Sequence, residues 1–238
     1  MPAATGQPSG KEIAASAKRR QFPPRCRAID RAHLCFLLLM SIAVPGSYYG
    51  VMFARGNFHE VVPQRVYRSA QPSERQLRAW IGQYGLKTIL SLRGTTAPMA
   101  EEEKAVADSM GVDMVYLSLG AHSLMPSAEL VRLIEVLQTA RKPMLLHCQH
   151  GIDRAGTASA LAAWLLGGQP YAQAKWQAYV PPGPWKHPKG APHISDVLLL
   201  YEDYCRQHGL SPDDSSLFKH WAAHVYCPAP STAGHDTW

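Results

Sequence analysis

The chain has 238 residues and a mass of 26.2 kDa, which suits one ordinary domain with additional segments. Apolar residues make up 46% of the sequence and charged residues 18%, a balance that excludes a wholly disordered chain. Five cysteines in a chain of this length, with no C-x-x-C pair, exclude a disulfide-stapled miniprotein and give no sign of a structural zinc site.

The net charge of +6 is concentrated at the N-terminus. Seven Lys and Arg side chains lie in residues 1–31 and are opposed there only by Glu12 and Asp30, so the rest of the chain is nearly neutral. A nucleic-acid-binding domain would carry its basic groups on the folded surface. The charge pattern therefore predicts a basic N-terminal tail over residues 1–31 and argues against nucleic acid as a partner.

Residues 32–54 contain no Lys, Arg, Asp or Glu and begin with a strongly apolar run. Because about 20 residues of α-helix cross the hydrocarbon core of a bilayer, this segment predicts an N-terminal transmembrane helix, a single-pass anchor. The basic tail then stays in the cytoplasm, which places the rest of this membrane protein on the extracytoplasmic side. Two alternatives remain: a cleaved secretory signal with Leu34–Val44 as its apolar core, and a buried helix of a soluble protein.

Strand-like and helix-like stretches alternate in the next part of the chain. In chain order the patterns predict a strand at 65–69, a helix at 73–85, a strand at 88–92, a helix at 99–110, a strand at 112–119, a helix at 127–139, a strand at 143–147 and a helix at 155–166. Further helices are expected at 171–179 and 193–207, followed by a partly disordered C-terminal extension over 208–238. This order predicts a single α/β domain with a mostly parallel central sheet flanked by helices, and a ligand site beyond the carboxyl ends of its strands.

One turn of this domain combines a cysteine at the end of a buried strand, Cys148, with an arginine six residues later, Arg154, where a helix begins. Backbone N–H groups of such a turn can face a bound oxyanion, and the helix N-terminus adds positive charge. Gly151 lets the turn bend tightly, and the planar guanidinium of Arg154 can hold two phosphate oxygens. The same positive field favours the thiolate of Cys148, so the pattern predicts a nucleophile at a phosphate site. The expected substrate-binding residues are Gln149, His150, Gly151, Ile152, Asp153 and Arg154.

The run from His147 to Arg154 resembles the signature loop of the cysteine-based protein tyrosine and dual-specificity phosphatases. Residues 66–73 and 85–94 resemble bacterial atypical dual-specificity phosphatases and the plant and fungal branch of that group. The likeness covers residues 57–207, which are expected to form a phosphatase domain of the dual-specificity type. By this resemblance Cys148 is the nucleophile and Arg154 the phosphate clamp, and neither a metal nor another cofactor is expected.

Two departures from the family pattern bear on turnover. Relatives usually carry Ser or Thr after the arginine, where its hydroxyl helps the thiolate leave during hydrolysis of phosphocysteine, whereas this chain has Ala155. Many relatives place an aspartic acid upstream as the general acid, but residues 117–127 contain no carboxylate. Asp153, in a position similar to the loop carboxylate of myotubularins, is therefore the predicted catalytic acid, and His122 is the alternative.

These patterns predict a membrane-anchored phosphatase that hydrolyses phosphomonoesters through a phosphocysteine intermediate. The expected partners are a phosphorylated protein, a phosphoinositide or an inositol phosphate, and in a protein the phosphate could be on tyrosine, serine or threonine. Ala155 and the missing upstream acid leave open a phosphate-binding pseudophosphatase with little turnover. A redox protein that pairs Cys148 with Cys205 or Cys227 is a third possibility. Arg68 and Arg93 follow or end strands, where they either line the pocket or face solvent.

Overall fold

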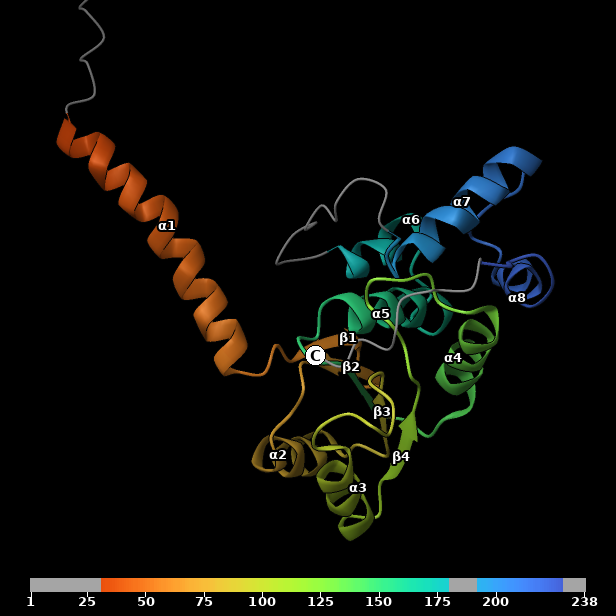
Figure 1. Ribbon diagram of the computed structural model, residues 1–238, viewed down its shortest axis with the longest axis horizontal. Helices are drawn as coiled ribbons and strands as arrows, with labels where there is room; N and C mark the ends of the chain where they lie inside the picture. The colour runs from red at the N-terminus through yellow and green to blue at the C-terminus, as the bar shows by residue number, and fades with distance from the viewer. Residues whose placement is uncertain (1–30, 180–191, 229–238) are drawn as a thin grey trace, which may run out of the picture. The chain divides into compact units, whose positions relative to one another are not determined.

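The computed structural model describes residues 31–179 and 192–228 of the chain. It contains a five-stranded sheet with helices on both faces (Figure 1). The strands are β1 (His59–Val62), β2 (Val66–Ser69), β3 (Thr88–Ser91), β4 (Asp113–Tyr116) and β5 (Met144–His147). They lie in the order β1-β2-β5-β3-β4, with β1 antiparallel to β2 and the other pairs parallel. The predicted α/β domain with a mostly parallel sheet is thus confirmed, and β1 is an addition to it.

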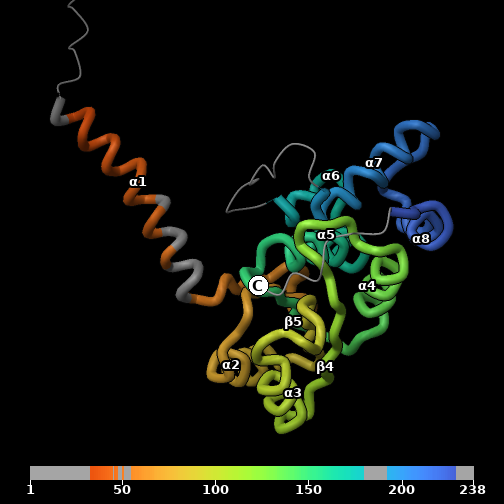
Figure 2. Tube along the Cα trace, in the orientation of Figure 1, coloured from red at the N-terminus to blue at the C-terminus, as the bar shows by residue number. Residues whose placement is uncertain are grey.

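The helices follow the expected order, with ends that differ from the prediction by a few residues. Those within the described residues are α1 (Arg31–Ala54), α2 (Glu74–Tyr84), α3 (Ala100–Ser109), α4 (Ser127–Thr139), α5 (Asp153–Leu165), α6 (Tyr171–Ala174), the 3-10 helix η2 (Lys175–Ala178), α7 (Asp196–His208) and α8 (Ser215–His224). Figure 2 traces the chain through them in sequence order.

Local signals explain why α2 begins and ends where it does. The Ser73 hydroxyl accepts a hydrogen bond from the backbone N–H of Gln76, and the Gln76 side chain accepts one from the backbone N–H of Ser73. This reciprocal capping satisfies amide groups that a helix start otherwise leaves unpaired. Gly85 ends the helix in the left-handed conformation, with φ of 63°, which a residue with a side chain adopts at a cost.

The sheet buries both of its faces. Helices α2 and α3 cover one face, where Ile89 and Leu145 are fully buried (Figure 1). Helices α4 and α5 cover the other face, where Leu90 and Leu146 are fully buried, and α7 and α8 lie outside these two helices in the same core. Successive strand residues point to opposite faces, so near-continuous apolar strands suit a sheet covered on both sides.

Helix α8 was not predicted from the sequence and packs into the main core. Phe218 and Trp221 of this helix are buried, and their rings contact that of Tyr201 on α7. Part of the segment predicted as a C-terminal extension therefore covers α4 and α7 rather than leaving the domain. The predicted domain limits, 57–207 and 208–238, stay a prediction.

The segment predicted to cross a membrane, residues 32–54, forms helix α1, but the structure does not support the anchor. In the part of the chain that the structure describes, no helix is long and apolar enough to span a bilayer. The basic tail over 1–30 lies outside the described residues, and the extracytoplasmic location stays a prediction.

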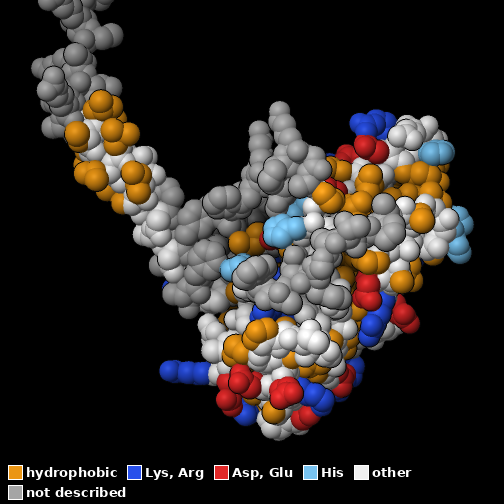
Figure 3. Space-filling view, viewed as in Figure 1, with side chains coloured by type: hydrophobic (Ala, Val, Ile, Leu, Met, Phe, Trp, Pro, Cys, Tyr) orange, Lys and Arg blue, Asp and Glu red, His pale blue; other side chains and the backbone are white. Residues whose placement is uncertain are grey.

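Charged side chains of both signs are intermixed over α2 and α3 on the face shown in Figure 3. Two of the exposed pairs have the i, i+4 spacing of a helix: Glu74 with Arg78, and Lys104 with Asp108. Such pairs contribute little to stability because water and salt screen them. They keep this surface mixed in charge rather than of one sign.

Candidate active site

The carboxyl ends of three neighbouring strands lie in register at one edge of the sheet. Ser69 of β2 and Ser91 of β3 both pair with His147 of the central strand β5. The loops that follow these strands therefore meet, and they bring Gln71 and Arg93 beside the loop that begins at Cys148. Parallel α/β sheets commonly bind ligands at this edge, and it is where the sequence places the expected site.

Hydrogen bonds from outside the loop after β5 turn its carbonyl groups outward. The backbone N–H of Gln71 donates to the carbonyl of Gln149 (3.1 Å), and Nδ2 of Asn57 donates to the carbonyls of His150 (2.9 Å) and Gly151 (3.2 Å). In a trans peptide unit the N–H group points opposite to the C=O group. The amide N–H groups of the three following residues therefore point away from Gln71 and Asn57.

Close packing of the loop against β2 requires glycine at position 151. Gly151 has φ of +69°, and a Cβ atom there would lie 2.6 Å from the backbone of Ser69 and Ala70. No side chain fits at that distance, and the positive φ disfavours L-residues independently. The glycine that the sequence singled out for a tight bend thus also permits the contact between the loop and the neighbouring strand.

Asn57, which the sequence did not indicate as a site residue, holds the loop from the side of β1. It is 1% exposed and has φ of +48°. Its Oδ1 lies 2.7 Å from Nε2 of His59, and burial, followed by the nearby charge of Arg68, lowers the pKa of His59. Asn57 is more than ninety residues from the loop in sequence, so no local pattern could have revealed this role.

Cys148 and Arg154 are both buried at this edge, with 2% and 8% of their surface exposed. Arg154 is the second residue of α5, and its Nη1 donates to the carbonyl of Leu119 (3.3 Å). Its Nε is buried and has no hydrogen-bond partner among the residues that the structure describes. A buried guanidinium with unused donor capacity is suited to an anionic ligand.

Two further arginines lie within electrostatic range of the Cys148 sulfur. Arg68 is 3% exposed and donates from Nη1 to the carbonyl of Gln177 (2.8 Å), so it does not face solvent. Burial lowers the pKa of Arg68, and the nearby Cys148 acts in the opposite direction. Burial, followed by the charge of Arg154, lowers the pKa of Arg93, whereas the nearby Glu103 and Cys148 act to raise it. The carboxyl edge of the sheet thus concentrates positive charge around one cysteine.

A chain of buried polar side chains connects this edge to α3. Nη1 of Arg93 donates to Oε1 of Gln71 (2.6 Å), and Nε2 of Gln71 donates to Oε1 of Glu103 (2.5 Å). Nε2 of His147 lies 3.2 Å from the same carboxyl oxygen. Burial raises the pKa of Glu103 to about 7 and lowers the pKa of His147 to about 3. His147 is therefore uncharged at neutral pH, and Glu103 is close to half protonated.

Asp153, the predicted general acid, lies beside a histidine that the sequence did not indicate. Oδ1 of Asp153 is 3.2 Å from Nε2 of His193, whose side chain is buried. The ring of His122, the alternative acid, has its centroid 6.4 Å from that of His193, and His122 is exposed. The structure therefore brings both candidate acids close to one buried imidazole.

The position after the arginine is closed to solvent. Ala155 is fully buried, and its side chain belongs to the main core. The nearest hydroxyl along α5, that of Thr157, donates to the backbone carbonyl of Asp153 (2.9 Å). Thr157 is thus engaged within its own helix, in keeping with the prediction that it is a poor substitute for the family's hydroxyl.

The remaining predicted binding residues differ in exposure: His150 is exposed and Ile152 half-buried.

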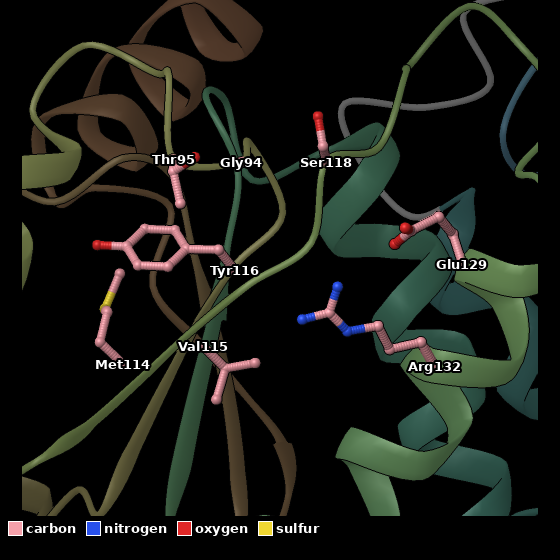
Figure 4. Close-up of a pocket in the computed structure, with 8 residues that line it drawn as sticks. All are labelled: Gly94, Thr95, Met114, Val115, Tyr116, Ser118, Glu129 and Arg132. Carbon is pink, nitrogen blue, oxygen red and sulfur yellow. The ribbon is translucent and has the colours of Figure 1, made fainter.

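A separate hollow of about 440 Å³ lies along β4, the edge strand of the sheet (Figure 4). Glu129 and Arg132 of α4 line one side of it, and Val115 extends from β4 toward them. Met114 and Tyr116 project from β4 to the other side. None of its lining residues comes from the loop after β5, so this hollow is distinct from the candidate site.

The cysteines within the described residues are free thiols: Cys35, Cys148, Cys205 and Cys227. Cys205 lies in α7 at 1% exposure, and burial raises the pKa of its thiol. The disulfide that a redox role would require is therefore not formed among them. Over the same residues, no three His, Cys, Asp or Glu side chains form a group that could hold a metal ion.

Several solved structures are similar to this chain. The catalytic domain of the PP-IP phosphatase SIW14 from S. cerevisiae is 21% identical, with 64% of this chain and 93% of that chain covered and a TM-score of 0.47. TpbA from P. aeruginosa is 24% identical, with 49% and 69% covered and a TM-score of 0.41. Tk-PTP is 18% identical, with 63% and 97% covered and a TM-score of 0.47. A comparison with curated proteins finds no match.

The family model described as DSP-PTPase phosphatase fused to NAD+ kinase matches residues 54–175. This range is about half of the chain, and it contains the loop after β5 together with most of the sheet and helices that position it. The chain therefore belongs to this family and is a cysteine-dependent phosphatase of the dual-specificity type.

Proposed function

We propose that the chain hydrolyses phosphomonoesters through a phosphocysteine intermediate on Cys148. The observation that carries this proposal is the outward hydrogen bonding of three successive loop carbonyls, at residues 149–151, by Asn57 and Gln71. It supports a loop whose amide groups are held in place for an oxyanion before any ligand arrives, next to the N-terminus of α5.

The proposed reaction has two steps. In the first, the Sγ atom of Cys148 attacks phosphorus, so that an S–P bond forms while the bond from phosphorus to the leaving oxygen breaks. Arg154 and the loop amides bind the phosphoryl oxygens, and the carboxyl of Asp153 gives its proton to the leaving oxygen. In the second, water attacks phosphorus, its proton passes to the Asp153 carboxylate, and the S–P bond breaks to release phosphate and the thiolate.

The proposed substrates are phosphotyrosine, phosphoserine or phosphothreonine in proteins, phosphoinositides and inositol phosphates. Arg93 adds a half-buried cation beside Cys148, and Arg68 adds a buried one. Such a concentration of positive charge favours ligands with several negative charges, such as inositol phosphates, over a single phosphotyrosine. Turnover of a phosphotyrosine peptide and of an inositol polyphosphate by the same preparation would rank the two classes.

The test of the reaction is turnover of para-nitrophenyl phosphate by wild type and variants. Cys148→Ser is expected to abolish turnover and to retain affinity for vanadate, because the anion-binding groups remain. Cys227→Ser is the matched control, since Cys227 is an exposed free thiol, and it is expected to leave the rate unchanged. Undiminished turnover in Cys148→Ser would exclude the phosphocysteine route.

A phosphate-binding protein with little turnover is the second candidate. Buried Ala155 and the engaged hydroxyl of Thr157 favour it, because neither assists the second step. If the missing hydroxyl limits turnover, Ala155→Ser should release phosphate faster after a burst of equal size. Wild-type protein that binds vanadate but gives neither a burst nor steady turnover would establish the binding function in place of the enzyme.

A further inference from the structure

We infer that His193 is a positioning residue for Asp153, so that the proton donor of the reaction is held by a segment outside the phosphate loop. The inference rests on the proposed function and deepens it. His193 lies in the short segment before α7, far from the loop in sequence, with its Nε2 atom 3.2 Å from Oδ1 of Asp153.

The contacts of the His193 ring determine which of its nitrogens carries the proton. The backbone N–H of Ser195 points at Nδ1 of His193 (3.2 Å), and the Ser195 hydroxyl oxygen is 2.7 Å from the same nitrogen. A backbone N–H can only donate, so Nδ1 acts as an acceptor in this arrangement. With Nδ1 as acceptor, the imidazole carries a proton on Nε2, the nitrogen that lies 3.2 Å from Oδ1 of Asp153.

The surrounding backbone fixes the imidazole. His193 is 4% exposed, and its backbone N–H donates to the carboxylate of Asp196 (2.9 Å). The next residue, Ile194, is fully buried and donates from its backbone N–H to the carbonyl of Ala121 (3.2 Å). The ring is therefore held by its own turn and by the loop that contains Ala121.

Asp153, by contrast, is one-third exposed and is the first residue of α5. Contact with the buried imidazole helps to hold its carboxyl group at a constant place beside the loop. As Asp153 gives its proton to the leaving oxygen, negative charge develops on the carboxylate. The Nε2–H group of His193 stabilises that charge, which favours proton transfer.

Leaving groups of different basicity separate this role from a purely structural one. Para-nitrophenolate leaves without a proton, whereas the phenolate of phenyl phosphate, with a conjugate-acid pKa of about 10, needs one. His193→Ala is therefore expected to lower kcat/KM, which reports the first chemical step, by about tenfold or more for phenyl phosphate and to leave kcat/KM for para-nitrophenyl phosphate nearly unchanged. His220→Ala, which removes an exposed histidine of α8, is expected to change neither rate.

Two amide variants test the atom that carries the effect. The side-chain nitrogen of glutamine reaches the place of Nε2 of histidine, and that of asparagine the place of Nδ1. His193→Gln is therefore expected to restore much of the phenyl phosphate rate, and His193→Asn is not. This comparison holds even if His193→Ala folds poorly, because the two amides differ by one methylene.

Non-additivity completes the test. In an Asp153→Asn background, which is itself expected to slow phenyl phosphate selectively, His193→Ala should give no further selective loss. Equal slowing of both substrates by His193→Ala, or equal restoration by the two amides, would overturn the inference. If wild-type turnover requires Cys148 but the His193 variants keep the normal ratio of the two rates, the inference alone is rejected. If turnover does not require Cys148, the proposed function is rejected.

Discussion

Glu103→Gln should change how the stability of the protein depends on pH. Glu103 is 4% exposed, and burial raises its pKa to about 7 from the 4.5 of an exposed glutamate. Between these two pH values the folded state binds more protons than the unfolded state. The free energy of unfolding of the wild type therefore falls as the pH rises through this window, because a buried carboxylate forms.

The two pKa values give the size of the effect. Between about pH 5 and about pH 8, the ionisation of Glu103 lowers the free energy of unfolding by about 2 kcal/mol. In a domain of this size that corresponds to about 4–8 °C in Tm. The amide of Glu103→Gln still offers an oxygen to Gln71 but does not ionise, so the variant should escape this loss.

His147 contributes the opposite trend in both proteins. Burial lowers its pKa to about 3 from 6.5, so between these values the unfolded state binds more protons and stability rises with pH. Because this contribution is common to wild type and variant, it cancels in the difference between them. The difference between the two pH profiles therefore reports Glu103.

Urea unfolding of wild type, Glu103→Gln and Glu102→Gln at about pH 5 and about pH 8 is the measurement. The stability of Glu103→Gln relative to wild type should increase by about 2 kcal/mol from the lower pH to the higher. Glu102 is the exposed neighbour on α3, so its variant removes the same charge and should follow the wild-type profile. Parallel profiles for Glu103→Gln and wild type would refute the reasoning.

Two backbone features of the loop give further predictions. Gly151→Ala should lower Tm far more than Gly168→Ala. Both glycines have positive φ, but only at Gly151 would a Cβ atom lie 2.6 Å from neighbouring backbone. Thermal unfolding of the two variants checks this, and equal shifts in Tm would contradict it. Asn57→Gly keeps the left-handed backbone and leaves two loop carbonyls without their donor. It should destabilise the fold by about 1–3 kcal/mol and weaken vanadate binding, as titration would show; unchanged affinity would mean that Asn57 does not shape the loop.

The sequence predicted those parts of the fold that local chemistry determines. Ser73 and Gly85 delimit α2 by capping, and the apolar spacing of 127–139 specifies α4 within its observed limits. The short edge strand β1 was missed because its four residues provide no distinct alternation. Helix α8 was missed because its apolar residues, Phe218 and Trp221, are buried only by contact with α4 and α7, which the sequence pattern of 215–224 does not show.

The site divides in the same way. The motif itself shows Cys148, Gly151 and Arg154, because their spacing and the change from strand to helix are local features. No local pattern indicates Glu103 or His193 as site residues. Glu103 is on α3 and His193 lies before α7, and only the folded chain brings these segments to the site. The buried position of Arg68 likewise depends on η2, whose carbonyl receives its hydrogen bond.

The loop carbonyls, Arg154 and Asp153 each contact a partner that the motif does not contain. Asn57 and Gln71 turn the loop carbonyls, the carbonyl of Leu119 holds Arg154, and His193 lies against Asp153. A chain with the same motif but without these partners would have the reactive groups without their arrangement. The departure at Ala155 lies inside the motif, whereas the groups that contact the loop carbonyls, the proposed clamp Arg154 and the proposed acid Asp153 are present. We therefore expect any defect of this protein to fall on the release of phosphate and to spare its binding and the first chemical step.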